Sequence, residues 1–97
     1  MYTYMNRIYI VYLSSNAEKA LDKIPDYIAR KLQLWVDDVE ERGLPEVRKV
    51  PGFHDEPLKG DLQGLRSIRL NKAYRAIYRE DMCEIYILEV NKHDYKK

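Results

Sequence analysis

The chain has 97 residues, of which 45% are hydrophobic and 34% are charged, as in one small globular domain. This length excludes a barrel enzyme, a doubly wound nucleotide-binding sheet with a separate substrate domain, and a large substrate cavity. The 17 Lys and Arg almost balance the 16 Asp and Glu, so only the distribution of charge can indicate a nucleic-acid partner.

The first half of the chain predicts one strand followed by a helical hairpin. Residues 1–6 are expected to form a lead-in, and residues 7–13 are rich in the β-branched and aromatic side chains typical of a strand. Ser14, Ser15 and Asn16 are candidate N-caps for a first helix, and Pro25 either ends this helix or is the first residue of the second. An apolar stripe along residues 26–42 predicts the second helix, with Gly43 as its C-terminal cap.

The second half predicts an antiparallel meander. Residues 44–64 read as a loop with one short element near 46–50, and strands are expected over 66–70, 74–79 and 84–90. Turns fall at 71–72 and 80–81. The β-α-α-β-β-β order predicts a single α+β domain over residues 1–97, with the helical hairpin packed on one face of a small antiparallel sheet. We expect the first strand to join this sheet, at a position that the sequence does not fix.

Basic residues gather in the second half, mainly as arginines between residues 59 and 79. Alternate strand residues share a face, so if the apolar residues of these strands pack on the helices, Arg69 and Arg75 project from the open face. Two guanidinium groups on adjacent strands provide the bidentate, permanently charged donors that suit a phosphate. Alternatively, these side chains are solvated or paired with Glu84 and Glu89 of the next strand.

The two histidines lie in non-helical segments, His54 in the long loop and His93 just beyond the last strand. Either could be an ordinary surface residue. Tyr95 lies close to His93, where it could stack on a base or hydrogen-bond a phosphate. The sequence has no metal-ligand spacing and no glycine-rich phosphate loop, so we expect no metal and no other cofactor.

The single cysteine, Cys83, excludes an intramolecular disulfide and indicates a reducing compartment. The apolar run over residues 8–13 is too short for a signal-peptide core or a membrane span. We therefore expect a cytoplasmic protein that has no membrane partner.

Three motifs carry a family resemblance: EPLKGDLQGLRSIRL at 56–70, YRAIYR at 74–79 and HDY at 93–95. Together they resemble the RelE/ParE superfamily of toxins from type II toxin–antitoxin systems, and most closely its HigB and YoeB branches. The resemblance implies a sheet with helices on one face and an RNA-cleaving surface on the other. It also implies ribosome-dependent cleavage of messenger RNA, in which the 2′-hydroxyl attacks the neighbouring phosphate and leaves a 2′,3′-cyclic phosphate.

The resemblance assigns roles to particular residues. Glu56 matches the general base of the YoeB-like pattern, Arg69 and Arg75 match the arginines that hold the scissile phosphate, and His93 matches the general acid. His54 is an alternative base. The remaining RNA-binding residues expected on this surface are Lys59, Arg66, Lys72, Tyr95 and His54.

The resulting prediction is a metal-independent messenger-RNA endoribonuclease toxin that inhibits translation. Its expected partners are the ribosome, messenger RNA and a cognate antitoxin, of the helix-turn-helix DNA-binding type. A ParE-like inhibitor of DNA gyrase is the main alternative, and a non-catalytic protein-binding module is a third. The joint occurrence of Glu56, Arg75 and His93 favours the nuclease.

Overall fold

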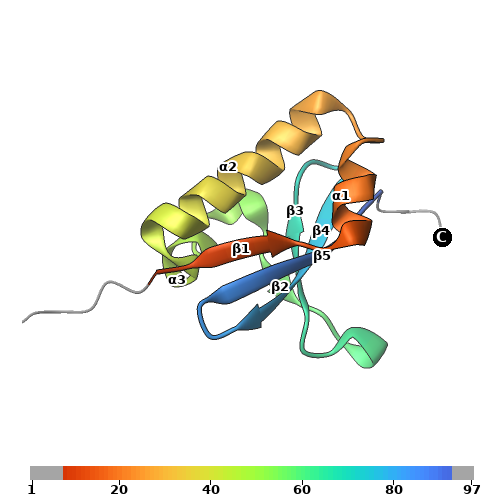
Figure 1. The fold of residues 1–97 in the computed structure, drawn as a ribbon. Coiled ribbons are helices and arrows are strands. Elements are labelled where there is room, and N and C mark those ends of the chain that lie inside the picture. Colours follow the sequence, from red (N-terminus) through yellow and green to blue (C-terminus); the bar gives the residue numbers. More distant parts are fainter. Residues whose placement is uncertain (1–7, 93–97) are drawn as a thin grey trace, which may run out of the picture.

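The computed structural model describes residues 8–92, in which helices cover one face of a five-stranded sheet (Figure 1). The predicted α+β order is confirmed. The helices are α1 (Ser15–Leu21), α2 (Asp26–Arg42) and the short α3 (Leu44–Arg48). The strands are β1 (Ile10–Leu13), β2 (Glu56–Pro57), β3 (Arg66–Arg69), β4 (Tyr74–Asp81) and β5 (Glu84–Lys92). Two 3-10 turns, η1 (Pro51–Phe53) and η2 (Gly60–Leu62), interrupt the long loop.

The strands follow the order β1-β5-β4-β3-β2. Strands β2 to β5 pair antiparallel with their neighbours, which confirms the predicted meander. Strand β1 joins at the far edge and pairs parallel with β5, which makes the sheet mixed. The sequence left this position open because pairing between the first and last strands depends on contacts far apart along the chain.

The start of α1 and the end of α2 lie where the sequence predicts, whereas α1 already ends at Leu21, before Pro25. The Ser14 hydroxyl accepts a hydrogen bond from the Ala17 amide at 3.0 Å and donates one to the Leu88 carbonyl at 2.7 Å, so it caps α1 and ties it to β5. Gly43 ends α2 at φ 90°, and a Cβ there would lie 3.2 Å from the Tyr9 ring. Both the left-handed backbone and the close ring favour glycine at this position.

The turn between β4 and β5 lies two residues later than predicted. Strand β4 continues to Asp81, which pairs with Glu84, so the connection is the two-residue turn Met82–Cys83. Met82 adopts φ 59°, a conformation that glycine or asparagine usually supplies in such turns. The sequence therefore carries no ordinary turn signal at this point.

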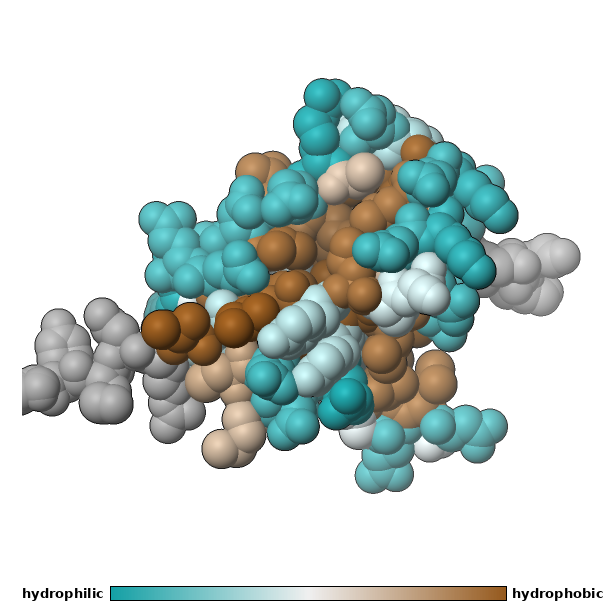
Figure 2. Space-filling model, in the orientation of Figure 1, coloured by the Kyte–Doolittle hydropathy of each residue, from teal (hydrophilic) through white to brown (hydrophobic). Residues whose placement is uncertain are grey.

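The core lies between α2 and the sheet. The apolar stripe of α2 is buried as predicted, at Ile28, Leu32, Trp35 and Val39. The Trp35 ring packs against that of Tyr78 on β4, with centroids 5.1 Å apart. Hydrophobic surface is nevertheless visible along β1 in Figure 2, where Ile8, Ile10, Tyr12 and Leu13 are exposed. No helix within residues 8–92 is long and apolar enough to cross a membrane.

Candidate functional site

The two strand arginines lie on one face of the sheet. Arg69 and Arg75 are directly opposite one another in the β3–β4 register, and directly opposed residues point to the same face. Their neighbours Ile68 and Ala76 are fully buried toward the helices, so the arginines occupy the other, open face. The two arginines therefore share one face of the sheet, as alternation along the strands predicts. Opposed like charges destabilise a sheet unless counter-charges lie nearby.

Arg75 has its counter-charge in place. Its Nη2 donates to the Glu56 carboxylate and to the Ser67 hydroxyl, both at 2.8 Å. The Arg75 side chain is 16% exposed and that of Glu56 is 45% exposed, so the carboxylate remains open to solvent. Ser67 is buried. Strands β2, β3 and β4 thus bring a carboxylate, a hydroxyl and a guanidinium together, and the guanidinium is held from two sides.

Arg69 lacks such partners within residues 8–92. Its Nε is buried and has no hydrogen-bond acceptor among the described residues, and no ion pair is found for its guanidinium there. A buried donor without an acceptor is unfavourable, and more so when it carries charge. An anion bound on the open face could supply the missing acceptor beside Arg75.

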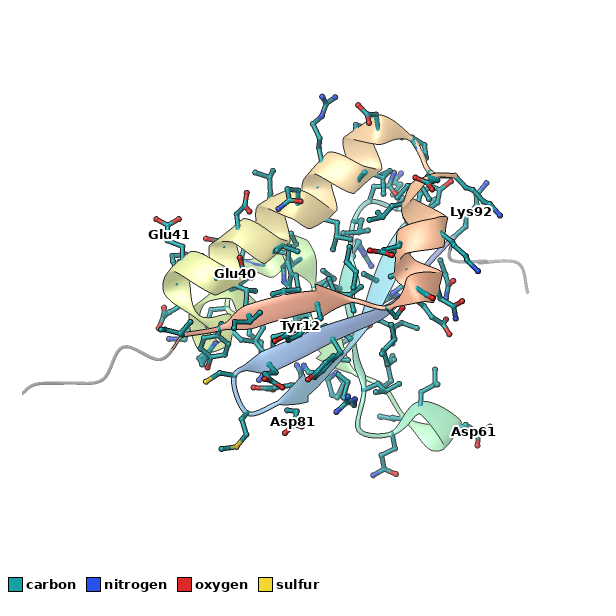
Figure 3. All side chains as sticks on the ribbon, in the orientation of Figure 1. Tyr12, Glu40, Glu41, Asp61, Asp81 and Lys92 are labelled. Atoms are coloured by element: carbon teal, nitrogen blue, oxygen red, sulfur yellow. The ribbon has the colours of Figure 1, made fainter. Side chains whose placement is uncertain are left out.

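A hollow of about 290 Å³ lies at the Arg75 cluster. This volume is at the lower limit for small-ligand sites and suits one nucleotide unit rather than a large substrate. Figure 3 shows Lys92, one of the lining residues, at the end of β5. The lining residues are Glu56, Leu58, Leu62, Ser67, Arg75, Ile77, Asn91 and Lys92. The predicted site residues His93 and Tyr95 lie outside the described part of the chain.

The other predicted RNA-binding residues differ in their distance from this hollow. Lys59 is exposed at the start of η2, between the lining residues Leu58 and Leu62. Lys72 is exposed in the β3–β4 turn, next to the two arginines in sequence. His54 is exposed with φ 50° and does not line the hollow.

Arg66 lies on the helix-facing side of the sheet, apart from Arg69 and Arg75. Its Nε donates to the Asp55 carboxylate at 2.6 Å, and the Tyr78 hydroxyl donates to the other Asp55 oxygen at 2.6 Å. The Asp55 side chain is only 1% exposed. Arg48 completes this buried cluster by donating to the Tyr78 hydroxyl at 3.2 Å.

This buried cluster changes how Tyr78 titrates. Burial raises the pKa of the Tyr78 hydroxyl above its ordinary value, and the hydrogen bond to Asp55 raises it further. Tyr78 therefore stays a neutral donor to Asp55. Sequence reasoning missed both this cluster and the role of Ser67. Asp55 lies just outside the motif at 56–70, and Ser67, although inside it, carries no signal of its contact with Arg75.

Within residues 8–92, no group of three or more His, Cys, Asp or Glu side chains could hold a metal ion. The open-face hollow instead offers permanent cations, one carboxylate and one hydroxyl. This combination can bind a phosphate and can take up a proton beside it.

Comparison with known proteins identifies the family. A family model described as the ParE toxin of the type II toxin–antitoxin system parDE matches residues 11–95. The chain therefore belongs to this family of toxins, within the RelE/ParE superfamily that its motifs resemble. A search of curated proteins found no match.

Solved structures share the fold over most of the chain. A chain of the RelBE2 toxin–antitoxin complex from Mycobacterium tuberculosis is 26% identical, with a TM-score of 0.67 over 90% of this chain and 100% of its own. A chain of the archaeal RelE–RelB complex from Pyrococcus horikoshii is also 26% identical, with a TM-score of 0.68 over 93% of this chain and 100% of its own. YafQ from Escherichia coli is 17% identical, with a TM-score of 0.70 over 88% of this chain and 93% of its own.

Proposed function

We propose that this toxin is an endoribonuclease that cuts messenger RNA on the ribosome, in the cytoplasm, without a metal or other cofactor. The observation that carries the proposal is the open-face cluster, in which Glu56 and Ser67 contact Arg75 at 2.8 Å in a hollow that fits one nucleotide unit. Arg69, whose buried Nε has no hydrogen-bond partner among the described residues, adds a second cation next to it.

Cleavage next to a 2′-hydroxyl needs a base, an acid and positive charge around phosphorus. Glu56 removes the proton of the 2′-hydroxyl, and the freed oxygen attacks the adjacent phosphorus. Arg75 and Arg69 stabilise the extra negative charge of the phosphorane. The P–O5′ bond then breaks, the leaving oxygen takes a proton from the acid, and a 2′,3′-cyclic phosphate remains.

The assignment of the acid to His93 comes from the family resemblance. His93 directly follows Lys92, which lines the hollow. Between the two possible bases, the hollow favours Glu56, because Glu56 lines it and His54 does not. A substrate phosphate bound to Arg75 competes with Glu56 for the same Nη2 donor, which frees the carboxylate to act as the base.

The remaining residues predicted to bind RNA lie in different parts of the molecule and are given different roles. Lys59 and Lys72 are exposed at the rim of the open face and are proposed to hold flanking phosphates. Tyr95 is proposed to contact the RNA from the chain end. For Arg66 we propose a structural role in place of RNA binding, because Asp55 holds its guanidinium on the other face.

The cognate antitoxin is proposed as the protein partner, since two of the structural relatives are toxin–antitoxin complexes. We propose a helix-turn-helix antitoxin, as in HigB-like systems. A second candidate function is inhibition of DNA gyrase. The observation that favours it is the match to the family model of ParE toxins.

Primer extension on a reporter transcript after toxin induction separates the two functions. The nuclease predicts new transcript ends that disappear when translation of the reporter is blocked, and that are lost in Arg75→Ala. Arg30→Ala is the matched control, because Arg30 is an exposed arginine on α2 that does not line the hollow. Intact transcripts together with inhibited supercoiling of plasmid DNA would establish the gyrase function instead.

A further inference from the structure

Three planar side chains from adjacent strands form a second feature of the sheet, which we call the Tyr–Tyr–Arg stack. The rings of Tyr12 on β1 and Tyr86 on β5 are stacked, with centroids 5.2 Å apart and planes 15° apart. The guanidinium of Arg79 on β4 lies over the same Tyr86 ring, 4.5 Å from its centroid. The sheet register aligns all three residues in one row across the strands.

The Tyr–Tyr–Arg stack lies on the same open face as the candidate site. Arg75 and Arg79 are four residues apart on β4, so their side chains share a face and their Cα atoms are about 13 Å apart. Tyr12 is 42% exposed, and the Arg79 side chain is 46% exposed. Figure 3 shows Tyr12 on β1, beside β5. The two outer members of the stack, Tyr12 and Arg79, are therefore both accessible to solvent.

Side chains of this kind hold nucleobases. Unpaired bases stack on tyrosine rings and on arginine guanidinium planes, with little dependence on which base is present. The Tyr86 hydroxyl donates to the Glu84 carboxylate at 2.5 Å, which fixes the ring at the centre of the stack. Asp81 lies 3.9 Å from Arg79. These two carboxylates disfavour a phosphate at this end of the sheet, so the stack suits a base rather than the RNA backbone.

Charge on the open face supports RNA over a protein as the ligand. The cations Arg69 and Arg75 lie at one end of the open face, and the carboxylates of Asp81 and Glu84 lie at the other end beside the stack. A strand with its phosphate at Arg75 reaches the stack within about four nucleotide steps, at ~3.4 Å per stacked step.

We propose that the Tyr–Tyr–Arg stack is a base-binding subsite, which holds an unpaired base of the RNA strand whose phosphate is bound at Arg75. This inference rests on the proposed function and extends it, because it adds a base contact to a site otherwise built for phosphate. The stack sets where the strand lies, and it contributes affinity without reading the base identity.

The test uses full-length toxin and fluorescein-labelled ten-nucleotide RNAs that are 2′-O-methylated throughout, which prevents cleavage. One set of oligonucleotides carries a single abasic site, moved one position at a time, so that each RNA lacks one base and keeps every phosphate. Fluorescence anisotropy gives the affinity of each RNA for wild type, Tyr12→Ser and Arg79→Lys. Arg79→Lys keeps the charge and removes the flat guanidinium. Tyr27→Ser, which alters an exposed tyrosine on α2, is the matched control.

For wild type and Tyr27→Ser, one abasic position should weaken binding at least about fivefold, as expected for the loss of one stacked base. Tyr12→Ser and Arg79→Lys should bind the intact RNA correspondingly more weakly and should no longer respond to that abasic position. Thermal melts followed by Trp35 fluorescence establish that each variant is folded.

The subsite is overturned if both variants bind like wild type, or if no abasic position matters. It is also overturned if the variants lose affinity only for a purified antitoxin, which would make the stack a protein interface. Failure of the subsite and failure of the proposed function give different results. If an abasic site weakens binding but translated messages are not cleaved, the subsite stands and the nuclease proposal fails. If Tyr12→Ser and Arg79→Lys cleave translated messages like wild type and no abasic site weakens binding, the nuclease proposal stands and the subsite fails.

Discussion

The buried carboxylate of Asp55 is expected to determine the stability of this small fold. Asp55→Ala removes the acceptor for Arg66 and for the Tyr78 hydroxyl, both bound at 2.6 Å. It also leaves Arg48, whose Nε lies 3.9 Å from Asp55, with one counter-charge fewer. The donors remain in place after the substitution, and a buried cation without its partner is the costly outcome.

The size of the effect follows from burial. Loss of one partner from a buried pair costs about 3–5 kcal/mol in the free energy of unfolding. Arg66 and Arg48 are 25% and 32% exposed, so water partly solvates both cations and the lower end applies, about 3 kcal/mol. For a domain of this size, that loss lowers Tm by about 12–24 °C.

The matched control is Asp38→Ala. Asp38 also binds an arginine, Arg42, at 2.8 Å, but this pair lies on the exposed surface of α2. Solvent screens such exposed pairs, so the loss of this one should change Tm by a few degrees at most. Melting curves followed by Trp35 fluorescence measure both variants. If Asp55→Ala lowers Tm by no more than Asp38→Ala does, the buried cluster does not stabilise the fold as argued.

Three further outcomes are expected. Ser67→Ala should lower the rate of RNA cleavage about tenfold while Ser67→Thr restores it, because the hydroxyl positions the Arg75 guanidinium; loss of cleavage in both variants would contradict that role. His93→Gln should abolish most of the toxicity without changing Tm, and unchanged growth arrest would remove His93 from the mechanism. Tyr78→Phe should reduce the decrease in the free energy of unfolding at alkaline pH. The pKa of Tyr78 is raised in the folded state, so wild type loses stability once pH rises above about 10, where the unfolded tyrosine ionises. Denaturant midpoints at neutral and alkaline pH measure this, and parallel curves for the two proteins would argue against it.

The parts of the fold that depend on local pattern could be predicted from the sequence. The α2 stripe repeats at helical spacing, and Ser14 and Gly43 are ordinary cap residues. The shared face of Arg69 and Arg75 followed from alternation along two strands joined by a short turn. In each case the deciding residues lie close together in the chain.

The remaining parts depend on pairings between distant segments. Strand β1 lies beside β5 only because of a register between the two ends of the chain, and the same register creates the contact between Tyr12 and Tyr86. The Asp55 cluster likewise joins a loop residue to Tyr78, 23 positions away. Tyr12, Tyr86 and Asp55 lie outside the sequence motifs, and the motif at 74–79, which contains Tyr78 and Arg79, does not reveal their distant partners. Neither the stack nor the cluster was therefore visible in the sequence.

In the proposed mechanism, a phosphodiester bound in the Arg75 hollow is cleaved by attack of the neighbouring 2′-hydroxyl. The most direct measurement is single-turnover cleavage of a message bound to purified ribosomes, compared with the same message carrying one 2′-deoxynucleotide at the cut position. Wild-type toxin should cut the first message to a 2′,3′-cyclic phosphate and leave the second intact. Arg75→Ala should be slower by about a hundredfold or more, as for loss of one group that stabilises transition-state charge. Cleavage of the deoxy-substituted message, or an unchanged rate for Arg75→Ala, would contradict the account.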